Sequence, residues 1–220
     1  MTQVLVGDRL TCIVADRAVL TNASLRLHAG ESVALLGPSG SGKTMLLTTL
    51  AGFLPPQSGT VLFRGEQLQL KSSGRRRIAS VFQTYGLFPL LTAAENVEIA
   101  LRIVGHNPAE ARSSALAALE SLALGRFAQH LTQELSGGQE QRVAIARALA
   151  TNPEVVLADE PTTEQDQIHR DLVLDQLLEV TGDGAAVLIA THDDEVAGRC
   201  DRVVQIRDGG IVAHAAGGSG

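Results

Sequence analysis

Short apolar runs separated by turn residues fill the first part of the chain. We expect strands at residues 3–6, 10–14, 23–28 and 32–36, because turn residues recurring every few positions are typical of antiparallel pairing. Two more β-rich runs follow at residues 60–64 and 78–82, with a polar loop at residues 71–74 between them. An apolar helix is expected to begin near Lys43 and to end at Gly52.

From residue 92 the spacing changes to that of helices. Thr92 to Glu95 has the form of a capping box and predicts a helix to about residue 104. Asn107 followed by Pro108 is a second start signal. Apolar side chains then recur at helical spacing and predict one stripe facing the core: Leu116, Leu119 and Leu122.

After residue 154 strands and helices alternate. We expect strands at residues 154–158, 186–190, 202–207 and 211–214, and helices at 165–180 and 193–199. This alternation implies a parallel sheet whose carboxyl ends carry the functional site. The predicted fold class is therefore α/β, with a mostly parallel sheet, an N-terminal antiparallel β subdomain and an inserted all-helical subdomain.

The same pattern predicts how the chain is divided. We expect one domain over residues 1–220, with the α/β core at 1–86 and 136–214 and the helical subdomain at 87–135. The small, polar residues 215–220 are expected to form a flexible tail.

Composition and charge narrow the class of protein. The chain has 220 residues, 45% of them hydrophobic, but no apolar run of the ~18 to 20 residues that a membrane span needs. Its start resembles no signal peptide, so we expect a cytoplasmic location. The net charge of −6 argues against non-specific nucleic-acid binding, and the arginines at residues 75–77 fit a solvated strand entry. Cys12 and Cys200 fit neither a metal quartet nor a disulfide framework and are expected to be reduced.

A phosphate-binding pattern follows the apolar run at residues 32–36. It matches G-x-x-x-x-G-K-[ST] with Gly37, Pro38, Ser39, Gly40, Ser41, Gly42, Lys43 and Thr44. The backbone amides of such a loop and the N-terminus of the next helix form an anion site. Lys43 would reach the β- and γ-phosphates, and the Thr44 hydroxyl would bind magnesium. A glycine-rich turn before an ordinary helix is the alternative, and the preceding strand speaks against it.

Two acids end the apolar strand that begins near residue 154. Asp159 would hold the magnesium ion, directly or through water. Glu160 is placed to polarise a water for attack on the γ-phosphate. By itself an acidic strand-to-loop junction is a weak signal, and the phosphate-binding pattern makes it a strong one.

A second glycine-rich anion site opens a helix at residues 135–139, whose sequence is Leu-Ser-Gly-Gly-Gln. One nucleotide does not need two such loops. At this point the chain resembles the ATP-binding cassette (ABC) ATPases, whose signature is LSGGQ, and the resemblance covers nearly the whole chain. It implies ATP as the ligand and a head-to-tail dimer with two composite sites. In that dimer the signature of one subunit closes over the γ-phosphate held by the other, through Ser136, Gly137, Gly138 and Gln139.

Three more positions match the family pattern. Gln83 takes the place of the glutamine that reaches magnesium and the attacking water and joins the helical lobe to the core. His192 takes the place of the histidine that contacts the γ-phosphate and orients Glu160. Asp166 matches the aspartate of the D-loop, which crosses the dimer interface. The region from Gln83 to Thr92 resembles the groove that receives a coupling helix from a membrane permease subunit.

Two departures from the family pattern affect the site. Between residues 11 and 20 there is no aromatic side chain to stack on adenine, so Arg17 would stack instead or the base would rest on Val19. This predicts modest nucleotide affinity and weak base discrimination. The D-loop, usually Ser-Ala-Leu-Asp or Gly-Asn-Leu-Asp, here has Glu164 and Gln165 before Asp166, which bears on interface geometry and hydrolysis rate.

The favoured interpretation is the ATPase subunit of a membrane transporter, peripheral to the cytoplasmic face of the membrane and bound to separate permease subunits. Its closing partner would be a second copy or a different ATPase. Within the family, residues 157–162 and 192–204 look most like the bacterial lipoprotein-releasing and macrolide-efflux ATPases. Two alternatives remain: a soluble, non-transport ABC ATPase acting on DNA or ribosomes, and a regulatory ATP-binding module with little turnover.

Overall fold

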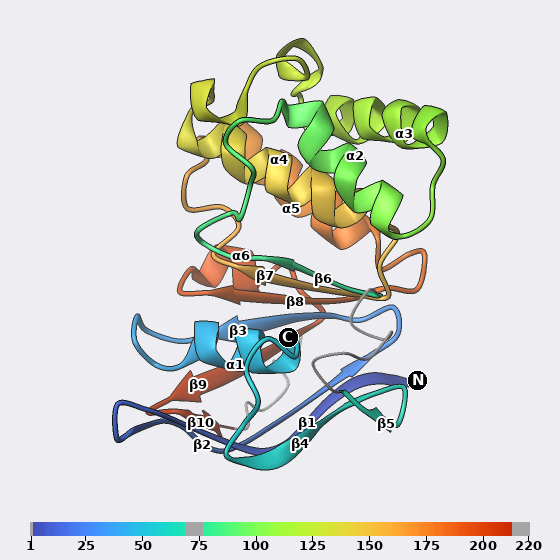
Figure 1. Ribbon diagram of the computed structural model, residues 1–220. Helices are drawn as coiled ribbons and strands as arrows, with labels where there is room; N and C mark the ends of the chain where they lie inside the picture. The colour runs from blue at the N-terminus through green and yellow to red at the C-terminus, as the bar shows by residue number, and fades with distance from the viewer. Residues whose placement is uncertain (1, 69–76, 213–220) are drawn as a thin grey trace.

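The computed structural model describes residues 2–68 and 77–212, and Figure 1 shows its arrangement. The polar loop expected at residues 71–74, two of the three arginines at 75–77, the end of the strand expected at 211–214 and the tail at 215–220 lie outside the described residues.

A six-stranded sheet forms the centre of the molecule, in the order β10-β9-β3-β8-β7-β6. Its strands are β3 (Ser32–Leu36), β6 (Ile78–Val81), β7 (Val155–Asp159), β8 (Ala186–Thr191), β9 (Arg202–Arg207) and β10 (Gly210–Val212). All pair in parallel except β10, which runs antiparallel to β9. The carboxyl ends of β3, β8, β7 and β6 therefore meet along one edge.

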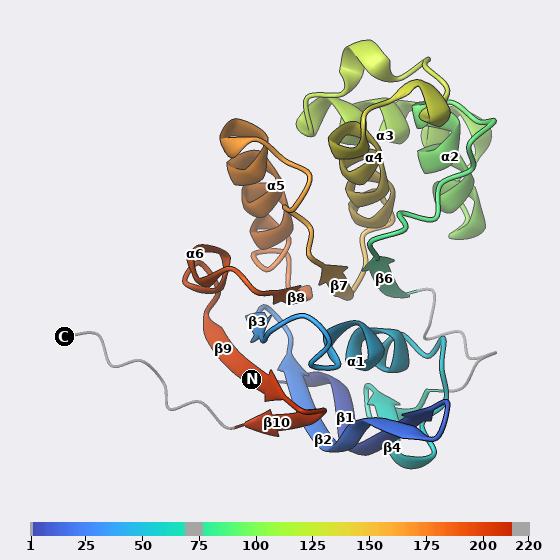
Figure 2. The same cartoon turned by 90° about the vertical axis from the view of Figure 1, so that its left-hand side faces the viewer.

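An antiparallel sheet lies on the other side of α1 (Lys43–Leu50), in the order β2-β1-β4-β5 (Figures 1 and 2). Its strands are β1 (Gln3–Val14), β2 (Arg17–His28), β4 (Ser58–Phe63) and β5 (Glu66–Gln67). The separate strands expected at residues 3–6 and 10–14 are wrong, because β1 is one strand of 12 residues. Register shifts between Gly7 and Leu10 absorb the turn-like residues as a bulge, which bends a strand without ending it. The strand expected at 23–28 likewise starts earlier, at Arg17.

The remaining helices lie on the opposite side of the six-stranded sheet from α1. They are α2 (Ala93–Ile103), α3 (Pro108–Ser121), α4 (Gly137–Ala150), α5 (Gln167–Glu179) and α6 (Asp194–Ala197). Figure 2 shows α4 and α5 above the sheet and α1 below it. The two predicted helix starts are confirmed, because Thr92 with Glu95 and Asn107 with Glu110 both form capping boxes.

The predicted core stripe of α3 is wrong at one position. Leu119 and Leu122 are buried, but Leu116 is 39% exposed. The buried face of the helix begins instead with the small side chains of Ala111 and Ala115. Since each helical residue is rotated by about 100° from the one before it, Leu116 cannot share the face of its neighbour Ala115.

Strands β7 and β8 are buried on both faces, which explains their continuous apolar sequences. On β7, Val155 and Leu157 pack with α1 and the antiparallel sheet, whereas Val156 and Ala158 pack with the helices. Both cysteines are free, and burial raises the pKa of the Cys200 thiol to about 11. In the part of the chain that the structure describes, no helix has both the length and the apolar character needed to cross a bilayer.

Candidate functional site

The loop between β3 and α1 forms a tight cradle at the edge where the parallel strands end. A Cβ on Gly37 would lie 2.6 Å from the carbonyl oxygen of Ile206, and one on Gly42 would lie 2.9 Å from that of Val19. Gly42 also has φ of 105°, in the left-handed region that favours glycine. It is the N-cap of α1 and offers no side chain as a cap, which leaves the first amides of this helix available to a ligand.

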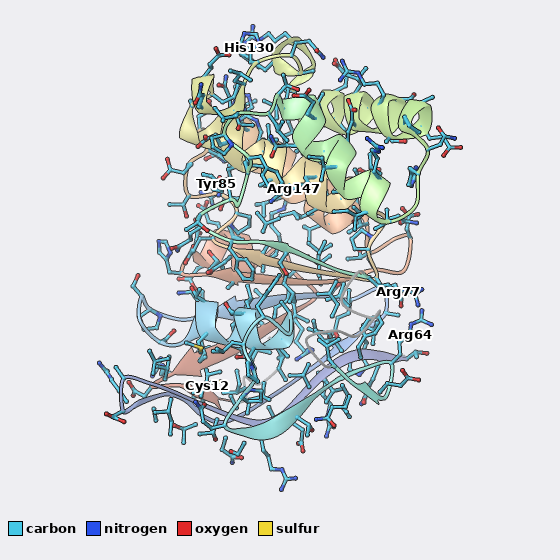
Figure 3. All side chains as sticks on the ribbon, in the orientation of Figure 1. Cys12, Arg64, Arg77, Tyr85, His130 and Arg147 are labelled. Carbon is cyan, nitrogen blue, oxygen red and sulfur yellow. The ribbon has the colours of Figure 1, made fainter. Side chains whose placement is uncertain are left out.

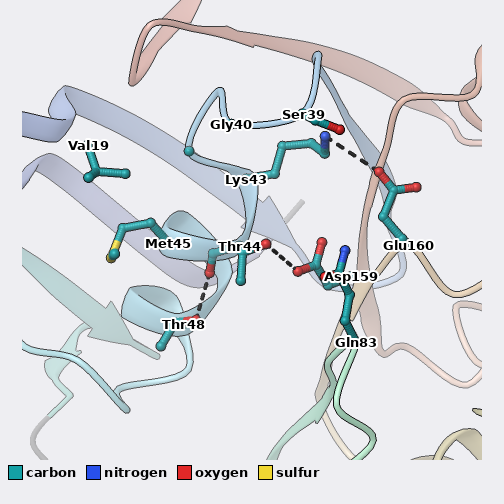
Figure 4. A pocket seen from close by; sticks show the side chains of 11 residues that line it. Val19, Ser39, Gly40, Lys43, Thr44, Met45, Thr48, Gln83, Asp159 and Glu160 are labelled. Atoms are coloured by element: carbon teal, nitrogen blue, oxygen red, sulfur yellow. Dashed lines mark hydrogen bonds and ion pairs between the residues drawn. The ribbon is translucent and has the colours of Figure 1, made fainter. Parts of the chain in front are cut away.

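Lys43 and Thr44 join the cradle to the acids at the end of β7 (Figure 4). The buried Lys43 Nζ donates to the Gly37 carbonyl oxygen at 2.7 Å and lies 3.5 Å from Glu160 Oε1. The Thr44 hydroxyl donates to Asp159 Oδ2 at 2.5 Å. Four of the residues predicted to handle phosphate and metal therefore contact one another.

Asp159 and Glu160 differ in their surroundings. Burial raises the pKa of the Asp159 carboxyl, and the hydrogen bond from Thr44 opposes that shift. Among the described residues its Oδ1 has no hydrogen-bond partner. Glu160 is 9% exposed and has φ of 49°, a left-handed conformation that non-glycine residues rarely adopt. Its amide donates to the Ala190 carbonyl oxygen at 2.9 Å, so β8 helps to hold that conformation.

His192 and Gln83 complete the group of side chains. His192 follows β8, and its Nδ1 lies 2.9 Å from Glu160 Oε1. Gln83 follows β6 and lies beside Asp159 in Figure 4. It lines a cavity of about 440 Å³ together with the cradle and both acids. Residues from four distant parts of the sequence thus meet at one edge of the sheet.

The signature residues stand apart from this cavity. Ser136 is the N-cap of α4 and forms a capping box with Gln139, whose Oε1 accepts from the Ser136 amide at 2.9 Å. Asp166 caps α5 and accepts from the His169 amide at 3.0 Å. Neither Ser136 to Gln139 nor Asp166 lines the cavity at the cradle.

A family profile described as ABC transporter matches residues 20–163, which include the cradle, the signature, Asp159 and Glu160. The chain belongs to the ABC transporter family. It is an ATP-binding and ATP-hydrolysing subunit of such a transporter, and the non-transport alternative is not favoured.

Individual relatives agree with this family. The chain is 38% identical over 205 residues to an uncharacterized ABC transporter ATP-binding protein of Bacillus subtilis, YknY, covering 90% of this chain and 89% of that one. It is 36% identical to MJ0796, described as a bacterial ABC transporter cassette, with a TM-score of 0.88 over 94% of this chain and 96% of that one. One MJ0796 structure is described as a dimer in a post-hydrolysis state with ADP and Pi.

The structure of this ABC subunit confirms the predicted fold class and adds residues that the pattern did not single out. Met45 and Thr48 line the cavity beside Thr44, and the Thr48 hydroxyl donates to the Thr44 carbonyl oxygen at 2.7 Å. Thr44 and Thr48 are four residues apart on a predicted helix, and this spacing could have placed them side by side from the sequence alone. Val19 lines the cavity, and Arg17 lines a neighbouring one. Both side chains expected to contact adenine therefore lie near the cradle.

Proposed function

We propose that this chain hydrolyses ATP with Glu160 as the base, Lys43 as the phosphate ligand and His192 as the group that orients Glu160. The observation that carries the proposal is the convergence of these three side chains, with Glu160 Oε1 3.5 Å from Lys43 Nζ and 2.9 Å from His192 Nδ1. An incoming γ-phosphate would take Lys43 from Glu160. The released carboxylate would then accept a proton from the attacking water while His192 holds its orientation.

We further propose that Mg²⁺ binds beside the cradle. This ion prefers hard oxygen donors. The site offers the Thr44 hydroxyl, the side-chain oxygen of Gln83, and Asp159 Oδ1, which is buried and has no hydrogen-bond partner among the described residues. The described residues contain no cluster of three or more His, Cys, Asp or Glu side chains suited to a metal ion. Phosphate oxygens and water would therefore complete the coordination shell of Mg²⁺. Bound Mg²⁺ would neutralise charge on the β- and γ-phosphate oxygens.

A second copy of this chain is proposed to complete each site. The cavity at the cradle is lined by the cation Lys43 and by the proposed base Glu160. Ser136 to Gln139 lie outside that cavity and present the N-terminus of a helix. In a head-to-tail dimer these amides would close over the γ-phosphate held by the partner's cradle, and Asp166 would lie at the interface. The dimers described for MJ0796 support this proposal.

A permease subunit at the cytoplasmic face of the membrane is the proposed partner of residues 83–92. Phe88 and Leu90 are 53% and 75% exposed there. The backbone beneath them is held firmly, because Asn96 exchanges hydrogen bonds with Phe88. Arg147 also donates to the Tyr85 and Gly86 carbonyl oxygens, and Figure 3 shows its side chain beside Tyr85. An exposed apolar pair on a fixed backbone suits an apolar partner helix.

Hydrolysis measured against protein concentration tests the catalytic proposal. For the purified chain, ATP turnover per molecule should rise with concentration, because each site needs two subunits. Glu160→Gln should lower turnover at least about 100-fold and form a dimer in ATP that gel filtration detects. A Glu160→Gln variant with wild-type turnover would exclude Glu160 as the base. Turnover that is independent of concentration, in a chain that gel filtration shows to be monomeric in ATP, would exclude the dimer.

Membrane binding tests the proposed docking surface. Inverted membrane vesicles from the source organism should retain the chain, whereas protein-free vesicles of the same lipids should not. Leu90→Asp should lower the retained fraction. Ile103→Asp makes the same change at a 61% exposed position on α2 and should bind as the wild type does. Equal losses in both variants would argue against a surface at residues 83–92.

A further inference from the structure

The side chain of Gln165 ties the D-loop to the signature helix of the same chain. Its Nε2 donates to the Gly138 carbonyl oxygen at 3.0 Å and to Gln141 Oε1 at 2.7 Å. Its Oε1 accepts from Arg142 Nη1 at 2.5 Å. All three partners lie on α4, so this one amide joins a loop between β7 and α5 to the helix that carries the signature.

The contact continues from α4 to Glu160. Gln141 is 3% exposed, and its Nε2 donates to the Glu160 carbonyl oxygen at 3.0 Å. Since that carbonyl belongs to a residue with φ of 49°, its direction depends on the groups that hold it. The Gln141 amide has one donor bonded to Glu160 and its oxygen bonded to Gln165. Turning that amide over would break both bonds.

Arg142 gives Gln165 a second task. Arg142 is 6% exposed, and its Nε has no hydrogen-bond partner within residues 2–68 and 77–212. Burial lowers the pKa of Arg142, as expected when a cation leaves water. Gln165 Oε1 supplies an acceptor to this buried cation. The leucine usual at this place in the family could make none of these three bonds.

We propose that Gln165 is a positioning residue which, through Gln141, transmits the position of the signature helix to Glu160 within one subunit. The two side-chain amides form a relay from α4 and the D-loop to the backbone of Glu160, and so fix the direction of its carboxylate. The inference rests on the proposed role of Glu160 as the base. The relay predicts that turnover depends on both glutamines. ATP binding at the cradle should be unaffected, because neither glutamine lines the cavity there.

A double-mutant cycle tests the relay. Gln165→Leu and Gln141→Met should each lower kcat about tenfold, because small misplacements of a reacting group are costly. The KM for ATP and the ATP affinity should stay within about twofold of wild type. The double variant should lose no more kcat than the worse single variant, since both changes break one connection. Gln167→Leu, at an exposed glutamine two residues along the chain, is the control and should keep its kcat.

Gln165→Glu separates the two tasks of this side chain. It keeps an acceptor for Arg142 but loses the donor to Gln141 and Gly138, so the relay predicts the same low kcat as for Gln165→Leu. Wild-type kcat in Gln165→Glu, or losses that multiply in the double variant, would overturn the relay. If Glu160→Gln abolishes turnover while Gln165→Leu does not change it, the relay is wrong and the proposed role of Glu160 stands. If Glu160→Gln keeps turnover, the proposed base itself is wrong.

Discussion

The cradle at residues 37–44 and the signature at residues 136–139 are alike in sequence and different in structure. Both are glycine-rich and both begin a helix. The cradle is enclosed by segments from elsewhere in the chain, and its helix has no side-chain cap. The signature helix is capped by its own Ser136 and Gln139, and it lies outside the cavity.

This contrast shows what makes an anion site complete. Helix N-termini attract anions wherever they occur, but the cradle adds a buried cation, two acids and a cavity that bring chemistry to the phosphate. Ser136 to Gln139 offer backbone amides and lie outside that cavity. Each copy of the chain thus carries two parts of a site. On the proposed function, its cradle holds its own nucleotide and its signature completes the site of another copy.

Mixing two inactive variants is the clearest test of whether each site combines the cradle of one copy with the signature of another. Lys43→Ala removes the cation of the cradle, and Gly138→Ala places a Cβ 2.4 Å from the Glu164 carbonyl oxygen and so displaces the D-loop from the signature. We expect each variant alone to lose about 100-fold or more in turnover. A mixture should exceed either variant at least about tenfold, because a mixed dimer has one intact site. A mixture no more active than its parts would contradict the composite site.

Adding an aromatic ring should increase the affinity of the cradle for ATP. Val19 lines the cavity in place of an aromatic side chain, and strand β2 accepts tyrosine well. Val19→Tyr should tighten ATP binding about fivefold, as expected for a stacking contact worth ~1 kcal/mol. Competition binding of ATP, GTP and CTP measures this affinity. Wild type that holds ATP at least about tenfold tighter than GTP would contradict the weak base discrimination expected from the missing ring.

Removing a charge beside the signature should strengthen its half of the site. Glu164 Oε2 lies 3.4 Å from the position that a Cβ on Gly137 would occupy, so a carboxylate stands at the helix N-terminus where phosphate would bind. Glu164→Gln should tighten the ATP-dependent dimer about two- to fivefold. Glu66→Gln, an exposed change of the same charge on β5, is the control for analytical ultracentrifugation. Equal effects in both variants would assign the gain to net charge.

The smallest expected change is in the melting temperature, and it concerns Asp159. Burial raises the pKa of Asp159, so the folded chain binds this proton more tightly than the unfolded chain does. The stability that the proton adds is present below the unfolded pKa and is lost as pH rises through the folded pKa. Asp159→Asn should therefore raise the melting temperature at neutral pH by a few degrees while abolishing turnover. The exposed Asp183→Asn should change neither, and a lower melting temperature for Asp159→Asn would contradict the burial argument.

Local patterns predicted much of the fold. The capping boxes at Thr92 and Asn107 were found because each signal lies within four residues, and the alternation after residue 154 predicted the parallel sheet. The continuity of β1 and the exposure of Leu116 were missed, since a bulge and the rotation of a helix depend on neighbouring elements.

For the site, the sequence by itself determined the chemistry that each segment can supply. The phosphate-binding loop, the paired acids and the signature are written in short runs, because backbone amides and adjacent side chains serve a phosphate locally. The family resemblance had already implied that His192 orients Glu160. Only the tertiary structure decided the contact of Lys43 with Glu160 and the bridge from Gln165 through Gln141. The reason is that strand order and helix packing, which no local pattern encodes, bring these distant side chains together at the carboxyl edge of one sheet.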